Sequence, residues 1–343
     1  MRIGIPREVK DGEHRVALSP SGIRGLDVVV EPGAGEGVGF SDDDYRSAGA
    51  SLGNPWECEL VVKVKELQES EYRKPRPGQT VFGFAHFGPD PELLDAALAS
   101  GATFIAFETV GQASGLPILS PMSAIAGRLA VQVGAWCLQK QNGGSGVLLP
   151  GLDGVAPGKV VIVGAGNVGA NALHVAHGLG IETVVFAKSD RRFARLKTQY
   201  PRAELRSGPP AVQDADLVIA GVLTPGQMSP KLLSRKTLRT MRKGSALVDV
   251  GIDQGGIAET SRPTSHREPI YIEEGVVHYC VPNMPAACAR TASLALEKAV
   301  LPYVQLLLRG SVDPDLRSGI QVKAGKVTHE HLARDTGRAY SRL

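Results

Sequence analysis

Lys159-Val-Val-Ile-Val-Gly164-Ala-Gly166-Asn-Val-Gly169-Ala-Asn-Ala-Leu173 is the stretch that decides the fold. A run of apolar β-forming residues leads directly into Gly-x-Gly-x-x-Gly, and a segment of helical character follows. This order predicts the strand, tight turn and helix start of a dinucleotide-binding βαβ unit. Gly164 permits the turn, Gly166 lets the backbone approach a pyrophosphate, and Gly169 lets the helix pack closely on the strand. The alternative is a doubly wound domain that has lost its ligand.

The composition is that of a globular protein with more than one domain. The chain has 343 residues, of which 43% are hydrophobic, and this suffices for two packed cores. A net charge of +3 predicts no nucleic-acid or membrane partner. No apolar run approaches the roughly 20 residues of a membrane span, and the first residues resemble a strand rather than a signal peptide. We therefore expect a cytoplasmic location.

Cysteines and histidines give no evidence for a disulfide framework or a metal site. The cysteines form no Cys-x-x-Cys pair, so we expect buried free thiols at Cys58, Cys137, Cys280 and Cys288. The spacing of His174 and His177 on a helix suits a metal, but no third ligand is evident. His329 and His331 are two residues apart and therefore diverge on a helix. We expect no bound metal.

Apolar runs alternate with helical segments along most of the chain, which predicts mostly parallel sheets. The first part should contain strands at 3–6, 28–30, 60–64, 80–84 and 103–107, with a helix at 91–100. This part has no glycine fingerprint of its own. After the strand that enters the glycine loop, further strands are expected at 183–187, 217–220, 246–250 and 276–281.

Two long helices are expected to join the parts. The segment 121–138 has apolar residues every four positions and leads into the glycine-rich turn 142–146, so it should cross between domains. The segment from 283 to about 309 should return the chain to the first domain; its apolar positions are Leu294, Val300, Leu301, Val304 and Leu308. We predict an α/β protein of two Rossmann-like doubly wound domains with a cleft between them. One comprises 1–122 plus 300–343, and the other, 123–299, binds the dinucleotide.

Polar residues in apolar settings mark candidate sites. In the charged loop at 6–15, Arg15 directly precedes Val-Ala-Leu and is the charge best placed to be held inward, whereas most of the charges should be solvated. Alternation places Lys63 and Lys65 on one face of their strand. An exposed edge would explain both lysines. Alternatively, Lys65 points from the carboxyl end of the strand into the crevice where open α/β sheets bind ligands.

Two further candidates follow apolar strands. His86 stands at the end of the aromatic run 81–87, and a lone histidine is more often structural than catalytic. Asp253 follows a buried strand of the dinucleotide-binding domain, where a nicotinamide ring would lie. Spacing alone leaves the functional and structural interpretations open for each.

In combination, these motifs resemble the alanine dehydrogenase family, in order and across nearly the whole chain. The wider family includes the nucleotide-binding domains of proton-translocating transhydrogenase and N5-(carboxyethyl)ornithine synthase. The motifs that carry the resemblance are Arg15-Val-Ala-Leu, Lys63-Val-Lys65-Glu66, His86, Glu108-Thr-Val, Pro121-Met-Ser123, the glycine loop, Asp253-Gln254-Gly-Gly, Glu259-Thr-Ser-Arg-Pro-Thr-Ser-His266 and Val277-His-Tyr-Cys-Val-Pro-Asn283-Met-Pro.

The resemblance implies an enzyme whose active site lies in the interdomain cleft, with 1–122 plus 300–343 as the substrate domain. Arg15 and Lys65 match the family's binders of the substrate carboxylate and carbonyl oxygen. His86 matches the proton donor and acceptor, for which a pKa of about 6.5 is suitable. Asp253 matches the acid that positions water and ammonia. Asn283 matches a residue that lines the pocket.

The implied reaction is the reversible deamination of a small 2-amino acid, with L-alanine and pyruvate as the first expectation. Ala85, Phe87 and Gly88 replace the family's usual neighbours of the histidine, and Ala124 replaces a glutamate. Pro282 precedes Asn283, as in the carboxyethylornithine synthase branch. An opine-type reductase that joins a 2-oxo acid to an amine therefore remains an alternative, as does a non-catalytic nucleotide-binding protein. The resemblance also implies a homo-oligomer, commonly a hexamer.

The residues after the second strand of the dinucleotide unit favour NADP(H) over NAD(H). Ala187 occupies the site of the carboxylate that usually holds the ribose hydroxyls. The cations and hydroxyl that follow would bind a 2′-phosphate. Alternatively, Asp190 caps the next helix and the arginines are solvated. The candidate cofactor-binding residues are Ser123, Gly164, Gly166, Gly169, Lys188, Ser189, Arg191, Arg192 and Val222.

Overall fold

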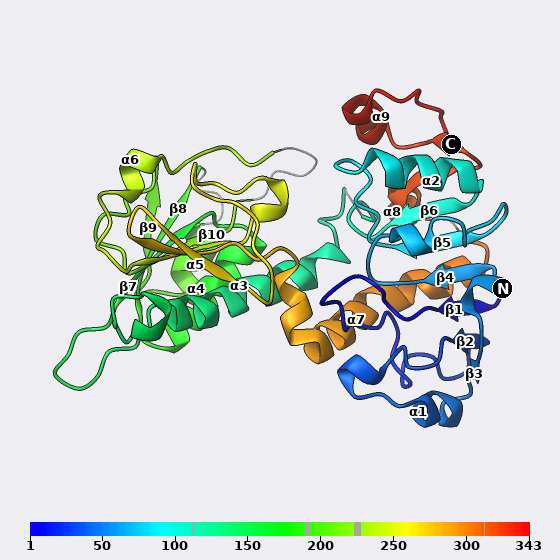
Figure 1. The fold of residues 1–343 in the computed structure, drawn as a ribbon, viewed down its shortest axis with the longest axis horizontal. Helices are drawn as coiled ribbons and strands as arrows, with labels where there is room; N and C mark the ends of the chain where they lie inside the picture. The colour runs from blue at the N-terminus through cyan, green and yellow to red at the C-terminus, as the bar shows by residue number, and fades with distance from the viewer. Residues whose placement is uncertain (112, 189–192, 223–227, 312) are drawn as a thin grey trace. The chain divides into compact units, whose positions relative to one another are not determined.

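The computed structural model describes residues 1–111, 113–188, 193–222, 228–311 and 313–343, and the chain forms two compact units (Figure 1). The first unit comprises Met1–Met122 and Ala286–Leu343, and the second comprises Ser123–Pro285. Both ends of the chain therefore belong to the first unit.

The first unit is built on a sheet in the order β15-β14-β6-β5-β4-β1-β2-β3. Its strands are β1 (Ile3–Ile5), β2 (Val28–Val30), β3 (Ser51–Leu52), β4 (Leu60–Val62), β5 (Thr80–Gly83), β6 (Thr103–Ala106), β14 (Ile320–Lys323) and β15 (Lys326–Val327). Strands β1 to β6 pair in parallel, whereas β14 and β15 are antiparallel. The order β3-β2-β1-β4-β5-β6 is that of a doubly wound domain, and the winding reverses between β1 and β4.

The five strands expected in the first part are confirmed, each to within two residues at its carboxyl end. The expected helix at 91–100 is α2 (Pro91–Ser100), which begins after the N-cap Asp90 and ends at Gly101 with φ of 67°. Strands β3, β14 and β15 were not expected, because two of them have only two residues and β14 lies in a tail without a strong apolar run.

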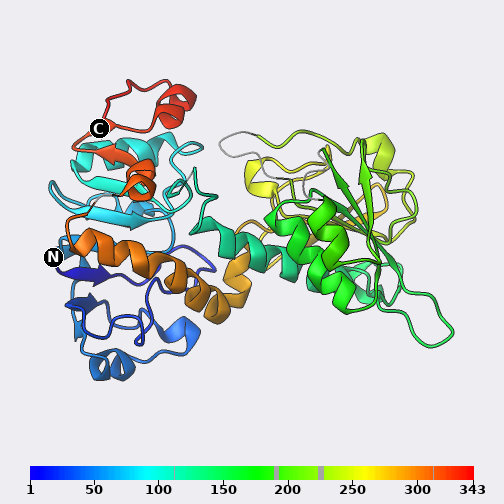
Figure 2. The ribbon, with the colours of Figure 1, turned by 180° about the vertical axis from the view of Figure 1, so that it is seen from behind.

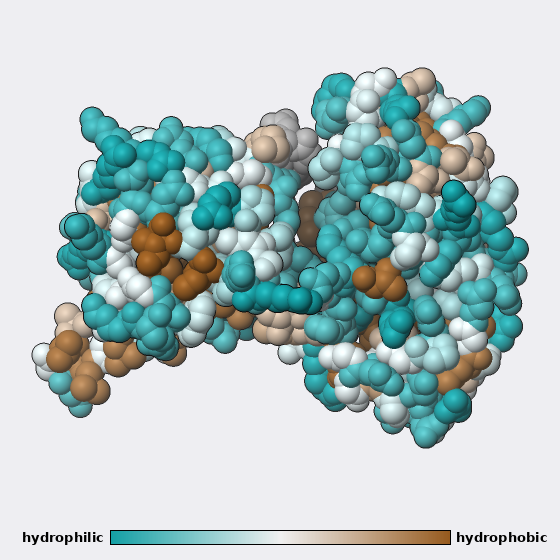
Figure 3. Space-filling model, in the orientation of Figure 1, coloured by the Kyte–Doolittle hydropathy of each residue, from teal (hydrophilic) through white to brown (hydrophobic). Residues whose placement is uncertain are grey.

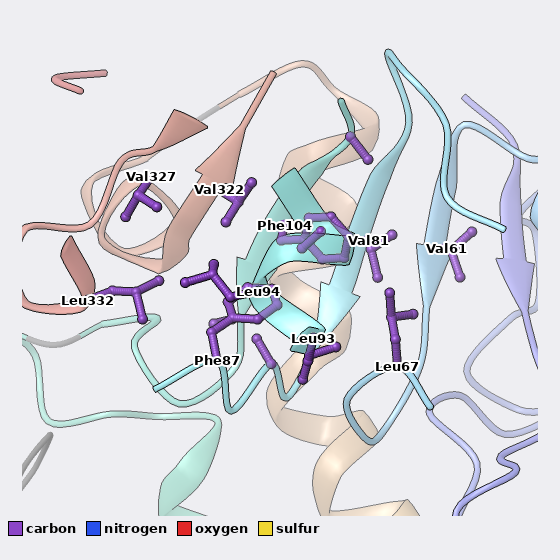
Figure 4. Packing of buried hydrophobic residues seen from close by; sticks show 14 of the residues in the cluster. Val61, Leu67, Val81, Phe87, Leu93, Leu94, Phe104, Val322, Val327 and Leu332 are labelled. Carbon is purple, nitrogen blue, oxygen red and sulfur yellow. The ribbon is translucent and has the colours of Figure 1, made fainter. Parts of the chain in front are cut away.

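Helices cover the sheet of the first unit. Figure 4 shows a core in which Leu93 and Leu94 of α2 pack on Val81, Phe104 and Val322. Figure 2 shows that α7 (Ala289–Leu308) crosses the sheet on the opposite face. The remaining helices of this unit are α1 (Asp42–Ser47), α8 (Pro314–Gly319) and α9 (Glu330–Thr336), with short 3-10 turns at Glu36–Val38, Pro55–Glu57, Glu69–Glu71 and Met284–Cys288.

The buried face of α7 differs from the expected one. Its buried residues are Ala292, Ser293, Leu296, Val300, Val304 and Leu307. Leu294 is exposed, and Leu301 and Leu308 are only partly buried. Of the expected apolar positions, Val300 and Val304 are correct. The small residues Ala292 and Ser293 lie inward instead of Leu294, since Ser293 Oγ accepts a hydrogen bond of 3.0 Å from the backbone amide of Val16.

The second unit has a sheet in the order β12-β13-β11-β10-β7-β8-β9. Its strands are β7 (Lys159–Val163), β8 (Glu182–Ala187), β9 (Glu204–Ser207), β10 (Leu217–Ala220), β11 (Ala246–Asp249), β12 (Ile270–Glu273) and β13 (Val276–Tyr279). All pairs are parallel except β12 with β13. The winding reverses between β7 and β10, so the expected α/β class and two doubly wound domains are confirmed.

Most of the expected long helix, α3 (Leu119–Cys137), belongs to the second unit, and its first residues belong to the first unit. It lies beside α4 (Asn167–Gly178), which follows the glycine loop (Figure 2). The other helices of the second unit are α5 (Phe193–Gln199) and α6 (Arg235–Leu238), with 3-10 turns at Lys140–Asn142 and Ile252–Gln254. Strands β9 and β12 were not expected, because both are sheet edges whose residues are mostly not buried and show no clear apolar alternation.

The face shown in Figure 3 is largely hydrophilic, with separate apolar patches. One loop of the second unit, residues 146–158, projects from its sheet (Figure 1) and is closed by a bridge between Leu152 and Val155. Leu148, Leu152 and Val155 on this loop are all strongly exposed. Among the described residues, no helix has the length and hydropathy needed to cross a membrane.

Candidate active site

Three of the candidate residues follow the central strands of the first sheet at their carboxyl ends. Arg15 follows β1, Lys65 follows β4 and His86 follows β5. Strands β1 and β4 flank the point at which the winding reverses, where open α/β sheets bind ligands. The topology thus brings these three side chains to one edge of the sheet.

Arg15 is held inward, as expected. It is 2% exposed, and its Nε and Nη2 donate hydrogen bonds of 2.8 and 2.6 Å to the two carboxylate oxygens of Glu13. Its Nη1 lies 3.2 Å from the Met122 sulfur. Glu8 and Glu13 are exceptions to the expectation that most charges of this loop are solvated. Both carboxylates are buried because each is paired with a buried cation, Glu13 with Arg15 and Glu8 with Lys63.

The explanation of Lys63 and Lys65 as an exposed edge is also wrong. Strand β4 lies between β1 and β5 in the middle of the sheet, and both lysines, just beyond its end, are buried. Lys65 Nζ lies 3.0 Å from His86 Nε2 and 5.8 Å from the centroid of the Phe84 ring. Lys65 and His86 are therefore in direct contact, which sequence spacing did not establish.

Glu66 belongs to the same cluster, although it was quoted in a motif and given no role. It accepts a hydrogen bond from Lys10, and its Oε2 lies 3.2 Å from Lys65 Nζ and 3.9 Å from His86 Nε2. Burial opposes ionisation of this carboxyl, but Lys65, His86 and Lys10 lower its pKa well below the ordinary range. Glu66 therefore stays ionised as a counter-charge. Its position next to Lys65 at the strand end was the available signal.

His86 has an unusual backbone conformation, with φ of 47°. Its amide donates a 2.8 Å hydrogen bond to Glu108 Oε1, and the amide of Ala85 lies 3.2 Å from both oxygens of the same carboxylate. The imidazole stacks on Phe84 at a centroid distance of 5.7 Å and remains 40% exposed. Glu108 thus stabilises a conformation that costs a non-glycine residue on the order of 1–3 kcal/mol.

The protonation state of His86 is set by its surroundings. Desolvation and then the ammonium of Lys65 lower its pKa below the ordinary value, and the carboxylate of Glu66 opposes this shift in part. The imidazole is therefore neutral near neutral pH and is able to accept a proton. Its Nε2 faces the Lys65 ammonium, so the lone pair lies on Nε2 in this arrangement.

The glycine loop of the second unit has the features that a dinucleotide requires. Gly164 has φ of 109°, and a Cβ there would lie 2.8 Å from the carbonyl oxygen of Gly221 and 3.2 Å from a methyl carbon of Val222. A Cβ on Gly169 would lie 1.8 Å from the oxygen of Gly164. Gly166 is the N-cap of α4 and makes no side-chain cap hydrogen bond, and the N-terminus of a helix after such a glycine loop is where a pyrophosphate binds. The described residues therefore fit the predicted cofactor.

The expected ribose contact is only partly described. Strand β8 ends at Ala187, which is partly buried, and Lys188 follows it with an exposed side chain. The strand end therefore carries no carboxylate. The predicted phosphate partners Ser189, Arg191 and Arg192, like Asp190, lie outside the described residues.

Asp253 is exposed on a 3-10 turn that follows β11. Hydrogen bonds with Asp249 and Lys231 hold the segment that follows this turn. Asp249 Oδ2, at the end of β11, accepts hydrogen bonds of 2.8 Å from the Ile257 amide and 2.6 Å from the Ser261 hydroxyl. Lys231 Nζ donates to the carbonyls of Gly255, Gly256 and Ala258. Neither Asp249 nor Lys231 was given a role from the sequence, although Asp249 lies in the strand expected at 246–250.

The remaining candidates lie at element ends. Ser123 is in the first turns of α3, and Asn283 follows β13 with φ of 55°. Among the described residues, no three His, Cys, Asp or Glu side chains are grouped as a metal would require. The four cysteines are free thiols; three are buried and Cys288 is partly exposed.

Comparisons with known proteins agree over both parts of the chain. The family model "Alanine dehydrogenase/PNT, N-terminal domain" matches residues 4–126, and "Alanine dehydrogenase/PNT, C-terminal domain" matches 130–330. The chain is 47% identical to the alanine dehydrogenase of Halomonas elongata, over 99% of this chain and 98% of that protein. It is 43% identical to the alanine dehydrogenase of Bacillus subtilis, over 99% and 96%. A solved L-alanine dehydrogenase superposes with a TM-score of 0.94 at 43% identity, over 98% of this chain and 99% of that one.

Proposed function

Because the chain belongs to the alanine dehydrogenase/PNT family, we infer that it is an alanine dehydrogenase, a nicotinamide-dependent oxidoreductase that acts on a CH–NH2 group. L-Alanine, oxidised cofactor and water yield pyruvate, ammonium, reduced cofactor and a proton. The first unit binds the substrate and the second binds the dinucleotide. The observation that carries the proposal is the 3.0 Å contact between Lys65 and His86, with the charge of the buried Arg15 close enough to lower the pKa of His86.

The cluster supplies the charges that a small 2-oxo acid needs. Arg15 binds the substrate carboxylate, and Lys65 binds the oxygen at C2, because desolvated cations at fixed positions stabilise negative charge strongly. Glu13 and Glu66 balance these cations when the substrate is absent, through the 2.6 and 3.2 Å contacts to Arg15 and Lys65. The site thus keeps its cations ordered and close to neutral overall.

His86 is the acceptor and donor of the proton at the C2 oxygen. In the deamination direction the neutral imidazole accepts a proton from the oxygen at C2, and in the reverse direction the imidazolium returns it. Asp253 positions the water or ammonia that adds to C2, and Asn283 and Ser123 line the substrate and cofactor sites. A dinucleotide held by the glycine loop would supply the acceptor or donor of the hydride at C2. The loop at Gly164, Gly166 and Gly169, together with Val222, binds the dinucleotide.

The substrate assignment is tested by supplying reduced cofactor and pyruvate with ammonium, ornithine or lysine, and following absorbance at the wavelength of the reduced nicotinamide. Oxidation with ammonium is the expected result. Oxidation with the diamines only would replace this function by the opine-type reductase. No oxidation, with retained cofactor binding, would leave a nucleotide-binding protein. His86→Ala and Asp253→Ala should lower kcat by about 10²–10⁴-fold while cofactor binding persists.

The proposal includes a preference for NADP(H). Its support among the described residues is the absence of a carboxylate at Ala187, at the end of β8, and the cation Lys188 next to it. Ala187→Asp should raise the ratio of kcat/KM for NAD(H) to kcat/KM for NADP(H), because it restores a ribose partner and repels a 2′-phosphate. Lys188→Ala is the control that removes one cation without adding an acceptor. A wild-type preference for NADH would contradict the proposal.

We further propose that the protein acts in the cytoplasm as a homo-oligomer. The exposed Leu148, Leu152 and Val155 on the projecting loop are apolar side chains that a second copy would cover. Light scattering after size exclusion measures the assembly. A monomer at micromolar concentration would contradict this part of the proposal.

A further inference from the structure

A buried charge cluster with no direct part in the proposed reaction lies next to the backbone of Lys65. It consists of Lys63, Glu8 and Glu71, whose side chains are 1%, 2% and 1% exposed. Lys63 Nζ lies 3.3 Å from Glu8 Oε2 and 3.2 Å from Glu71 Oε2. Burying an ion pair stabilises a fold little compared with apolar side chains of the same volume. The position of this cluster next to Lys65 therefore indicates a role other than stability.

The cluster binds the backbone that carries Lys65. Glu8 Oε1 accepts a hydrogen bond of 2.6 Å from the Val64 amide, and Glu8 Oε2 accepts one of 3.2 Å from the Lys65 amide. Lys63 Nζ donates to the carbonyls of Lys65, at 2.8 Å, and of Glu66, at 3.2 Å. Just beyond β4, the chain thus has both its amides and its carbonyls bound by buried charges.

We propose that Glu8, together with Lys63, is a positioning residue for Lys65: its carboxylate fixes the backbone from Val64 to Lys65 and so holds the Lys65 ammonium against His86. This proposal rests on the proposed function, since it assigns Glu8 to the substrate side of that site. The loop after β1 and the end of β4 are thereby locked together at the point where the winding reverses. A displacement of about 1 Å in a catalytic group can cost on the order of 10²-fold in rate.

Glu8→Gln tests the positioning role and Glu71→Gln is its matched control. Both residues are buried carboxylates that contact Lys63 Nζ, but only Glu8 accepts from the amide of Lys65. A glutamine at position 8 has one acceptor oxygen for two amides, and its NH2 group faces one of them. With pyruvate and ammonium as substrates, we expect Glu8→Gln to lower kcat/KM by about 10–100-fold with a raised KM for pyruvate. Glu71→Gln should change kcat/KM by no more than about twofold, and the Kd of the reduced cofactor should be unchanged in both.

A second measurement does not depend on turnover. The charged groups that face His86 are Lys65, Glu66, Lys10 and Arg15, with Glu108 at its backbone. The Lys65 ammonium lowers the pKa of His86, so displacing it should raise that pKa toward the ordinary value of about 6.5. Titration of ¹³C-labelled histidine, with His86→Gln to assign the resonance, should show this rise in Glu8→Gln and not in Glu71→Gln.

Equal effects of the two substitutions, or no effect of Glu8→Gln, would overturn the proposal. If Glu8→Gln does not fold, Glu8→Asp replaces it in the test, because the shorter side chain keeps the charge but moves it away from the two amides. If neither variant at position 8 folds while Glu71→Gln does, Glu8 has a role in stability alone. If the wild type does not turn over pyruvate and ammonium, the proposed function fails. The histidine titration would still decide the role of Glu8.

Discussion

Replacing Gly169 by alanine tests the link between the glycine loop and cofactor binding. The added Cβ would lie 1.8 Å from the Gly164 oxygen, whereas real Cβ contacts are essentially never under 3.0 Å, so the start of α4 must move by more than 1 Å from the loop. Overpacking of this kind costs about 1–3 kcal/mol. The displaced amides are those that would bind the pyrophosphate, so we expect the Kd of the reduced cofactor to rise by about 10²-fold or more.

Gly178→Ala in the same helix is the control. A Cβ there meets nothing within 4 Å, so this substitution should leave binding unchanged and stabilise α4 by about 0.4–1 kcal/mol. Fluorescence titration with reduced cofactor gives the Kd, and differential scanning fluorimetry without cofactor gives Tm, which shifts by about 2–4 °C per kcal/mol. Wild-type affinity in Gly169→Ala would refute the argument that this glycine is required by the loop.

Two further predictions concern stability. Because desolvation and Lys65 lower the pKa of His86, the unfolded chain binds a proton near pH 6.5 that the folded chain does not bind. The free energy of unfolding in urea should therefore fall more steeply between about pH 7 and 5 in the wild type than in His86→Gln; parallel pH profiles would contradict the assigned direction. On α7, Leu296→Ala should lower the free energy of unfolding by about 2–5 kcal/mol, and Leu294→Ala by about 0.5 kcal/mol, because Leu296 is buried and Leu294 is exposed. Equal losses would mean that the helix face is wrongly assigned.

Sequence patterns predicted the parts of the fold that local chemistry determines. The apolar periodicity of residues 91–100 predicted helix α2 to the residue, and in the structure Asp90 caps its start and Gly101 its end. Edge strands such as β9 escaped prediction because they bury little and need no apolar alternation. In the candidate site, Arg15 and Lys65 were identified from the sequence because each is a charged residue next to apolar residues. Glu8 and Glu66 were not given roles, because a carboxylate in a charged loop looks solvated until its cation is placed beside it.

The C-terminal segment of the chain completes the sheet of the first unit, which the first hundred or so residues begin. Strand β14, at Ile320–Lys323, pairs with β6, at Thr103–Ala106, and all of the second unit lies between them in the chain. A ribosome adds about 5–20 residues per second, so on the order of 10–40 s pass between the synthesis of β6 and that of its partner β14. The second unit, a continuous segment, is able to fold in that interval. Until β14 emerges, the open edge of β6 is where nascent chains would pair wrongly or bind a chaperone.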